Sequence, residues 1–254
     1  MLSNAQIKFI RSLHQKKYRI QHQSFIAEGE KIVSELLATS FSIRMICALP
    51  AWVEKNQSIL PHNISCVEIS VKELDRISAL KTPNQVLAVV DIPEYTVQDS
   101  ELENDLTLVL DNLQDPGNLG TIIRTADWFG IEHIICSPAT ADVYNPKVVQ
   151  ATMGSLLRVK VHYTELWPLL KSLKNKLPVY GTTLEGRSLF EHQPELPGIL
   201  IIGSESHGIS EEVKSMVTEE ITIPGFERPN RANKVDSLNA SVAAGILMAW
   251  FRKT

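Results

Sequence analysis

The sequence predicts an α/β protein with two parts, a small N-terminal α/β unit and a C-terminal α/β domain built on a parallel sheet. In the second half of the 254 residues, short apolar runs alternate with helical patterns, which is typical of a parallel sheet with helices on both faces. A polar, acidic stretch without periodicity at 93–104 is the best candidate for a linker. With 44% apolar and 21% charged residues, the chain can bury a sizeable core. We therefore expect units at 1–92 and 105–254, joined by 93–104.

The first unit begins with a helix at 4–18, because Ile7, Ile10, Leu13 and His14 recur at helical spacing. Ser70 followed by Glu73 is a capping-box pattern and marks the start of another helix. The remaining elements expected in this unit are strands at 25–27, 43–49, 66–69 and 85–92 and helices at 28–37 and 50–56.

The second unit opens with the apolar run 106–110, which suits a strand buried on both faces. Further strands are expected at 133–136, 179–182, 199–202 and 220–223. The helices between and after them are expected at 119–129, 147–153, 165–176, 211–217 and 238–251.

Composition and cysteine usage limit the protein class. Cys47, Cys66 and Cys136 form no CxxC pair, so neither a disulfide scaffold nor a structural metal site is expected. The chain opens with polar and then basic residues and has no apolar run long enough to span a membrane, so we expect a cytoplasmic protein.

The net charge of −4 does not indicate a strongly basic nucleic-acid binder, but the distribution of charge is uneven. The first 23 residues lack Asp and Glu and contain the basic residues Lys8, Arg11, Lys16, Lys17 and Arg19, with His14 and His22 among them. Such a segment can bind phosphates, or it can be an ordinary solvated helix face.

Ligands of an open parallel sheet bind at the carboxyl ends of its strands, so the residues that follow each strand carry the functional prediction. The segment 111–126 is a turn rich in Pro, Gly and Asn that leads into a helix, with Arg124 about a turn and a half inside it. Free backbone N–H groups and the guanidinium suit a phosphate or a polarised hydroxyl. The alternative is a well-formed strand-to-helix turn with a surface arginine.

Two later segments have the same position relative to a strand. Gly203 and Gly208 bracket a tight loop that contains Glu205, which can bind a ligand or an arginine or can simply belong to a turn before a helix capped by Ser210. After the strand that ends near Pro224, Ser237 is a natural N-cap for the last helix. Taken alone, this third segment is a capped C-terminal helix.

Together the three segments resemble, in order, the three motifs of the SpoU branch of the SPOUT-class RNA methyltransferases. The first motif matches Asn112, Asp115, Pro116, Asn118, Gly120, Ile122 to Ala126 and Phe129-Gly130. The second matches Gly203, Glu205 and Gly208, and the third matches Ile223-Pro224 and Ser237 to Ala243. The segment 145–155 is similar to the family's middle segment. The stretch 25–29 carries a looser similarity to the family's substrate-binding domain, which resembles a small ribosomal protein.

The resemblance implies a deep trefoil knot in the C-terminal domain, a homodimer, and methyl transfer from S-adenosylmethionine to a ribose 2′-hydroxyl of RNA. It places the cofactor against backbone groups of Gly203, Ile223 and Leu238, with Thr182 nearby. Arg124 is the family's candidate for activating the hydroxyl. Because an arginine is a poor general base, we assign it an electrostatic role. The residues expected to orient Arg124, the ribose and the cofactor are Asn118, Glu205, Ser237 and Asn239.

The substrate-binding domain favours ribosomal over transfer RNA. If all five basic residues of the N-terminal segment neutralise a phosphate, deleting 1–23 should lower the salt slope of binding by up to about 3.5. The alternatives are a transfer-RNA enzyme, a base methyltransferase and a non-catalytic RNA-binding or assembly protein. One departure from the family is the long loop 225–236, whose Arg228, Arg231 and Lys234 can contact RNA, cover the cofactor or belong to a surface insertion.

Overall fold

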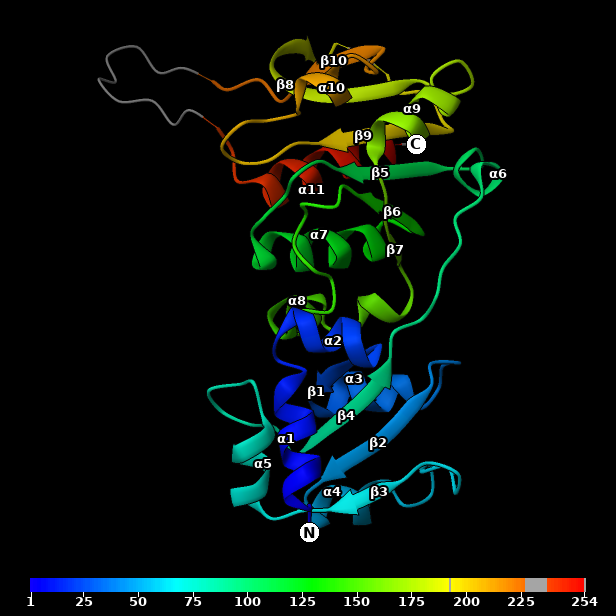
Figure 1. The fold of residues 1–254 in the computed structure, drawn as a ribbon. Coiled ribbons are helices and arrows are strands. Elements are labelled where there is room, and N and C mark those ends of the chain that lie inside the picture. The colour runs from blue at the N-terminus through cyan, green and yellow to red at the C-terminus, as the bar shows by residue number, and fades with distance from the viewer. Residues whose placement is uncertain (192, 227–236, 254) are drawn as a thin grey trace, which may run out of the picture. The chain divides into compact units, whose positions relative to one another are not determined.

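The computed structural model describes residues 1–191, 193–226 and 237–253, and its chain forms two compact units (Figure 1). Unit 1 comprises Met1–Glu94 together with Asp142–Leu157, and unit 2 comprises Tyr95–Ala141 and Arg158–Thr254. The segment Asp142–Leu157 therefore interrupts unit 2 in sequence and packs within unit 1. None of the helices formed by the described residues has both the length and the apolarity needed to cross a lipid bilayer.

Unit 1 contains a mixed four-stranded sheet with the order β1-β4-β2-β3. Its strands are β1 (Ser24–Glu28), β2 (Ile43–Ala48), β3 (Cys66–Glu68) and β4 (Val86–Asp91). β4 runs antiparallel to β1 and β2, while β2 and β3 are parallel. All four strands predicted from the sequence are confirmed, with boundaries that differ by at most one residue.

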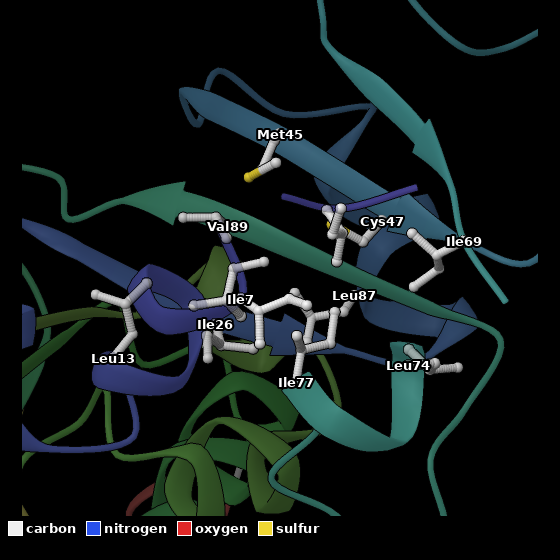
Figure 2. Packing of buried hydrophobic residues seen from close by; sticks show 12 residues of the cluster. Ile7, Leu13, Ile26, Met45, Cys47, Ile69, Leu74, Ile77, Leu87 and Val89 are labelled. Carbon is white, nitrogen blue, oxygen red and sulfur yellow. The ribbon is translucent and has the colours of Figure 1, made fainter. Parts of the chain in front are cut away.

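The helices of unit 1 are α1 (Asn4–Ser12), α2 (Lys16–His22), α3 (Glu30–Leu36), α4 (Pro50–Asn56), α5 (Val71–Ile77) and α8 (Pro146–Thr152), followed by a short 3-10 helix at Ser155–Leu157. The apolar side chains of α1 and α5 meet those of the sheet in one buried cluster (Figure 2). Ile7, Leu13, Ile26, Ile77 and Leu87 are among the side chains drawn there.

The prediction of one helix over 4–18 is wrong, because the chain turns between α1 and α2. Leu13 is fully buried, and its carbonyl oxygen accepts a hydrogen bond of 2.8 Å from Nη1 of Arg19. Arg19 also donates to Oδ2 of Asp142 from Nε (3.0 Å) and Nη2 (2.5 Å). With 2% of its surface exposed, Arg19 is a structural residue of unit 1. The condition that all five N-terminal basic residues neutralise a phosphate is therefore not met, because Arg19 is buried.

Unit 2 contains a six-stranded sheet with the order β10-β8-β9-β5-β6-β7, and every neighbouring pair is parallel. The strands are β5 (Leu106–Leu110), β6 (His133–Cys136), β7 (Lys160–Tyr163), β8 (Val179–Ser188), β9 (Gly198–Ile202) and β10 (Glu219–Thr222). The predicted parallel sheet is confirmed, but β7 is not among the strands predicted from the sequence. That edge strand contains few aliphatic residues, and its buried His162 does not read as a core position.

The helices of unit 2 are α6 (Asp99–Leu102), α7 (Pro116–Trp128), α9 (Leu166–Leu173), α10 (Glu211–Lys214) and α11 (Ala240–Phe251). One face of the sheet packs against α9 and α10 through a buried cluster that includes Val109, Ile135 and Ile201. On the other face, the Tyr180 ring contacts Trp250 and Phe251 of α11, and α11 packs against α7 (Figure 1). Helices therefore cover both faces, as the alternating pattern predicted.

Candidate functional site

A cavity of about 660 Å³ lies beside the middle of β8 and the carboxyl ends of β9 and β10. Its walls come from residues of these three strands, from the segments that follow β9 and β10, from α10 and from α11. β9 lies between β8 and β5, while β6 and β7 extend the sheet beyond β5. The chain order reverses across this part of the sheet, which is where parallel α/β sheets bind ligands. The cavity size is within the usual range for a small-molecule site.

The segment after β5 is held by side-chain hydrogen bonds at the end of that strand. Asp111 is buried, and its Oδ2 accepts a hydrogen bond of 2.7 Å from the backbone N–H of Ser210. The next residue, Asn112, has a positive φ of 56°, which turns the chain out of the sheet. Asp115 then caps α7 by accepting 2.7 Å from the N–H of Asn118, and Pro116 occupies the first helical turn. These contacts place Asn118 at the start of α7.

The loop after β9 is a tight hairpin. Ser204 and Gly208 exchange two backbone hydrogen bonds of 2.9 Å, and Gly208 has a φ of +67°. A Cβ added to Gly203 would lie 2.1 Å from the carbonyl carbon of Gly208, so no side chain fits there. The hairpin holds Glu205, Ser206 and His207 on the cavity wall.

The third segment enters α11 through Asn239. The Asn239 Oδ1 accepts hydrogen bonds from the backbone N–H groups of Ser241 (3.0 Å) and Val242 (3.3 Å). Asn239 is therefore the N-cap, and the prediction that Ser237 caps this helix is wrong. Ser237 instead lines the cavity.

Asn118 joins the three segments. Its Nδ2 donates 2.5 Å to Oε1 of Glu205, and its Oδ1 accepts 2.9 Å from Nδ2 of Asn239. These residues lie 87 and 121 positions away from Asn118 in the chain. The fold thus connects the three motifs through one amide side chain.

The cavity brings together most of the residues predicted from the sequence. Thr182, Gly203, Ile223 and Leu238, which were expected to bind a cofactor, all line it. Of the residues expected to take part in catalysis, Glu205 and Ser237 also line it. Asn118 and Asn239 lie outside the lining, where Asn118 donates to Glu205 and accepts from Asn239.

Arg124 is placed differently from the other predicted catalytic residues. It is exposed on α7 and does not line the cavity, and its side chain makes no hydrogen bond or ion pair within the part of the chain that the structure describes. α7 packs against α11, and Ala240, Ala243 and Leu247 of α11 form part of the cavity wall. Arg124 is therefore exposed on a helix that packs against part of the cavity wall.

Most charged residues of the cavity wall are not among the site residues predicted from the sequence. Glu185, Glu211, Lys214 and Glu220 line it beside Glu205, and Lys214 pairs with Glu220 at 3.6 Å. Glu185 was not predicted because the strand was expected to end at Thr182, whereas β8 continues beyond it. Glu211, Lys214 and Glu220 were not predicted because α10 and β10 were expected only to be part of the scaffold. Carboxylates outnumber the basic group in this wall, which favours a ligand with positive charge.

The hydroxyl of Thr183 lies buried in the cavity wall and has no hydrogen-bond partner among the described residues. A buried polar group without a partner in the protein usually bonds to a ligand or an ordered water molecule. Around it the wall is mostly apolar, with Ile202, Ile209 and Ile221 among its residues. An apolar wall with a few polar groups suits a heteroaromatic ring on a polar ligand.

The described residues contain no cluster of three or more His, Cys, Asp or Glu side chains arranged to hold a metal ion. The three cysteines are free thiols. Burial raises the pKa of Cys47 to about 12 and also raises that of Cys136. Of the predicted long loop 225–236, residues 227–236, and with them Arg228, Arg231 and Lys234, lie outside the described residues.

Models of two known protein families match the sequence, one in each half of the chain. A model described as the SpoU rRNA Methylase family matches residues 105–249. A model described as an MRM3-like substrate binding domain matches residues 4–88.

Individual relatives cover nearly the whole chain. The 23S rRNA (guanosine(2553)-2'-O)-methyltransferase RlmP of Bacillus subtilis is 29% identical over 98% of this chain and 96% of its own length. A solved structure from Porphyromonas gingivalis, assigned to the TrmH family of RNA methyltransferases, is 41% identical, covers 100% of both chains and has a TM-score of 0.89. An AdoMet-bound rRNA methyltransferase from Sinorhizobium meliloti is 29% identical, covers 100% of this chain and 96% of its own, and has a TM-score of 0.85.

Proposed function

The chain belongs to the SpoU rRNA methylase family, and from this premise we propose that it transfers a methyl group from S-adenosylmethionine to a ribose 2′-hydroxyl of ribosomal RNA. The observation that carries the proposal is the connection of three strand-end segments by Asn118 beside the cavity. Substrate binding is assigned to the N-terminal residues 1–92 and methyl transfer to 105–254, with 93–104 between them.

The cavity suits this cofactor in size, polarity and charge. S-adenosylmethionine has an adenine ring, a sulfonium centre and an amino-acid end, so its net charge is positive. The apolar wall and the buried Thr183 hydroxyl fit a ring with polar edges, and the excess of carboxylates fits the sulfonium. We assign cofactor binding to backbone groups of Gly203, Ile223 and Leu238, with Thr182 beside them. When bound, the cofactor supplies an electrophilic methyl group.

The protein's own side chains would position the reactants and stabilise charge. Arg124 is assigned the developing alkoxide or an adjacent phosphate, because a guanidinium remains charged and offers several donors. Asn239 holds Asn118, which in turn holds Glu205, and Ser237 lies on the cavity wall to orient the ribose. In-line placement of the hydroxyl oxygen against the methyl carbon can account for a large part of the acceleration.

The proposal includes a homodimer. α11 carries a single polar side chain, Ser241, and its apolar residues Val242 and Ile246, one turn apart, are 50% and 38% exposed. An apolar helix face open to water usually marks a protein contact. A second copy covering this face would lie close to α7 and thus to Arg124. Sedimentation equilibrium tests this, since a mass of one chain at micromolar concentration would contradict it.

The trefoil knot and the cytoplasmic location are also part of the proposal. Support for the knot comes from the family and from the placement of β8, β9 and β10 around the cavity. An experimental structure with an uninterrupted chain trace would show whether the path closes on a knot. Cell fractionation would test the location.

The activity is tested by incubating the protein with methyl-labelled S-adenosylmethionine and total RNA from a strain that lacks it. Nuclease digestion should recover the label in a 2′-O-methyl nucleoside of ribosomal RNA, and Arg124→Ala should retain cofactor binding but lose most of the transfer. Label in a base, or in transfer RNA, would contradict the proposal and support those alternatives. Absence of both label and cofactor binding would favour a non-catalytic RNA-binding protein.

A further inference from the structure

The surface formed by α1 and α2 combines positive charge with aromatic rings. Lys8 and Arg11, three residues apart on α1, are exposed, as are Lys16 and Lys17 on α2. The first Asp or Glu in the sequence is Glu28, so neither helix has a carboxylate of its own to neutralise these cations. Arg19 is excluded from this surface because it is buried against Asp142. The four exposed residues are called the basic strip below.

Three rings lie together across the two helices. Phe9 of α1 meets His22 of α2 edge to face, with ring centroids 5.1 Å apart. Tyr18 lies parallel to His22, with an interplanar angle of 16° and centroids 6.4 Å apart. Phe9 also packs against the buried core cluster of unit 1, which fixes the position of the three rings. Tyr18 and His22 are only half-buried.

The rings and the basic strip are interleaved. Lys8 directly precedes Phe9, and Lys17 directly precedes Tyr18, with its Nζ 5.9 Å from the centre of the Tyr18 ring. Alternation of cations with half-exposed rings matches the chemistry of a single-stranded nucleic acid, which presents phosphates and unpaired base faces together. A duplex presents the phosphates but keeps its base faces stacked inside.

We propose that the basic strip, with Tyr18 and His22, binds a single-stranded segment of the substrate RNA, the cations holding phosphates while an unpaired base stacks on Tyr18. This inference rests on the proposed function and adds the part of the substrate that unit 1 recognises. It selects an unpaired nucleotide of the substrate RNA rather than a helix. The salt slope of RNA binding should therefore reflect four exposed N-terminal cations instead of five.

The test measures binding of the full-length protein to a 20-nucleotide single-stranded RNA and to a duplex of equal length over a range of salt concentrations. Changing Lys8, Arg11, Lys16 and Lys17 together to Gln should lower the salt slope for the single strand by up to about 2.8, at roughly 0.7 per phosphate. A matched control changes four exposed lysines elsewhere to Gln and should leave the slope unchanged: Lys31, Lys72, Lys171 and Lys253.

Stacking is tested separately with Tyr18→Ala and Tyr18→Phe. Loss of the ring should weaken single-strand binding by roughly 5- to 150-fold, the factor equivalent to about 1–3 kcal/mol per stacked base, without changing the slope. Tyr18→Phe keeps the ring and should bind like the natural protein, and neither variant should change duplex binding. Thermal unfolding of each variant checks that the fold is intact.

Two results would overturn the inference. One is an unchanged salt slope in the four-residue variant, and the other is an equal effect of Tyr18→Ala on single strand and duplex. Methyl transfer by the unchanged protein is measured in parallel. If transfer to a ribose occurs while either result is found, only the inference about the basic strip fails. If no transfer occurs, the proposed function fails independently.

Discussion

Asn118 is the residue on which the geometry of the site depends most directly. One side-chain amide donates to a carboxylate and accepts from a second amide, and both partners come from distant segments. An amide can fill this position because it carries a donor and an acceptor on one planar group. A carboxylate of the same shape has no donor for Glu205.

Asn118→Asp should therefore reduce methyl transfer by about 10-fold or more, since a hydrogen bond to a charged group contributes roughly 1.5–3 kcal/mol and the new carboxylate repels Glu205. Cofactor affinity should change little, because Asn118 does not line the cavity. Single-turnover transfer and calorimetric cofactor binding measure the two effects. Equal loss in both would indicate that Asn118 supports the cavity wall rather than the reacting groups.

At the scale of elements, the start of α11 shows how two suitable capping residues were distinguished. Ser237 and Asn239 are both good N-cap residues, and both lie just before an apolar helical pattern. The backbone of the helix begins at Ala240, so only the side chain of Asn239 reaches the free N–H groups. Ser237 remains free to line the cavity.

Asn239→Ala should lower the free energy of unfolding by about 1 kcal/mol through loss of the cap. It should also reduce methyl transfer, because the hydrogen bond to Asn118 is lost. Ser237→Ala is the matched control and should leave thermal stability unchanged while affecting transfer alone. Urea unfolding followed by circular dichroism compares the two. A larger loss of stability in Ser237→Ala would contradict this assignment of the cap.

At the scale of the whole molecule, unit 1 is assembled from two separate stretches of sequence. In the chain, Asp142–Leu157 lies between β6 and β7 of unit 2. In space, its helix α8 packs against β1, and the ring centroids of Tyr144 and Phe25 are 4.8 Å apart. The buried pair of Arg19 and Asp142 fixes the beginning of this segment. Unit 1 is therefore incomplete without residues that follow β6.

Asp142→Ala should destabilise unit 1 by about 3–5 kcal/mol, because it leaves the Arg19 guanidinium buried without its counter-charge. Glu103→Ala removes the partner of Lys176 at 2.7 Å, an exposed pair, and should cost less than about 1 kcal/mol. Chemical denaturation of both full-length variants gives the comparison. Similar small losses would mean that water reaches Arg19 when Asp142 is removed.

The sequence by itself determined the alternation of strands and helices and the parallel sheet of unit 2, because strand ends, turns and capping residues are set by neighbours along the chain. The four cavity-lining residues Thr182, Gly203, Ile223 and Leu238 were predicted from the resemblance of the sequence to the SpoU family. Only the tertiary structure decided the break between α1 and α2, the burial of Arg19, the strand β7 and the bridging role of Asn118. Each of these depends on a partner far away in sequence, and no local pattern records such a partner.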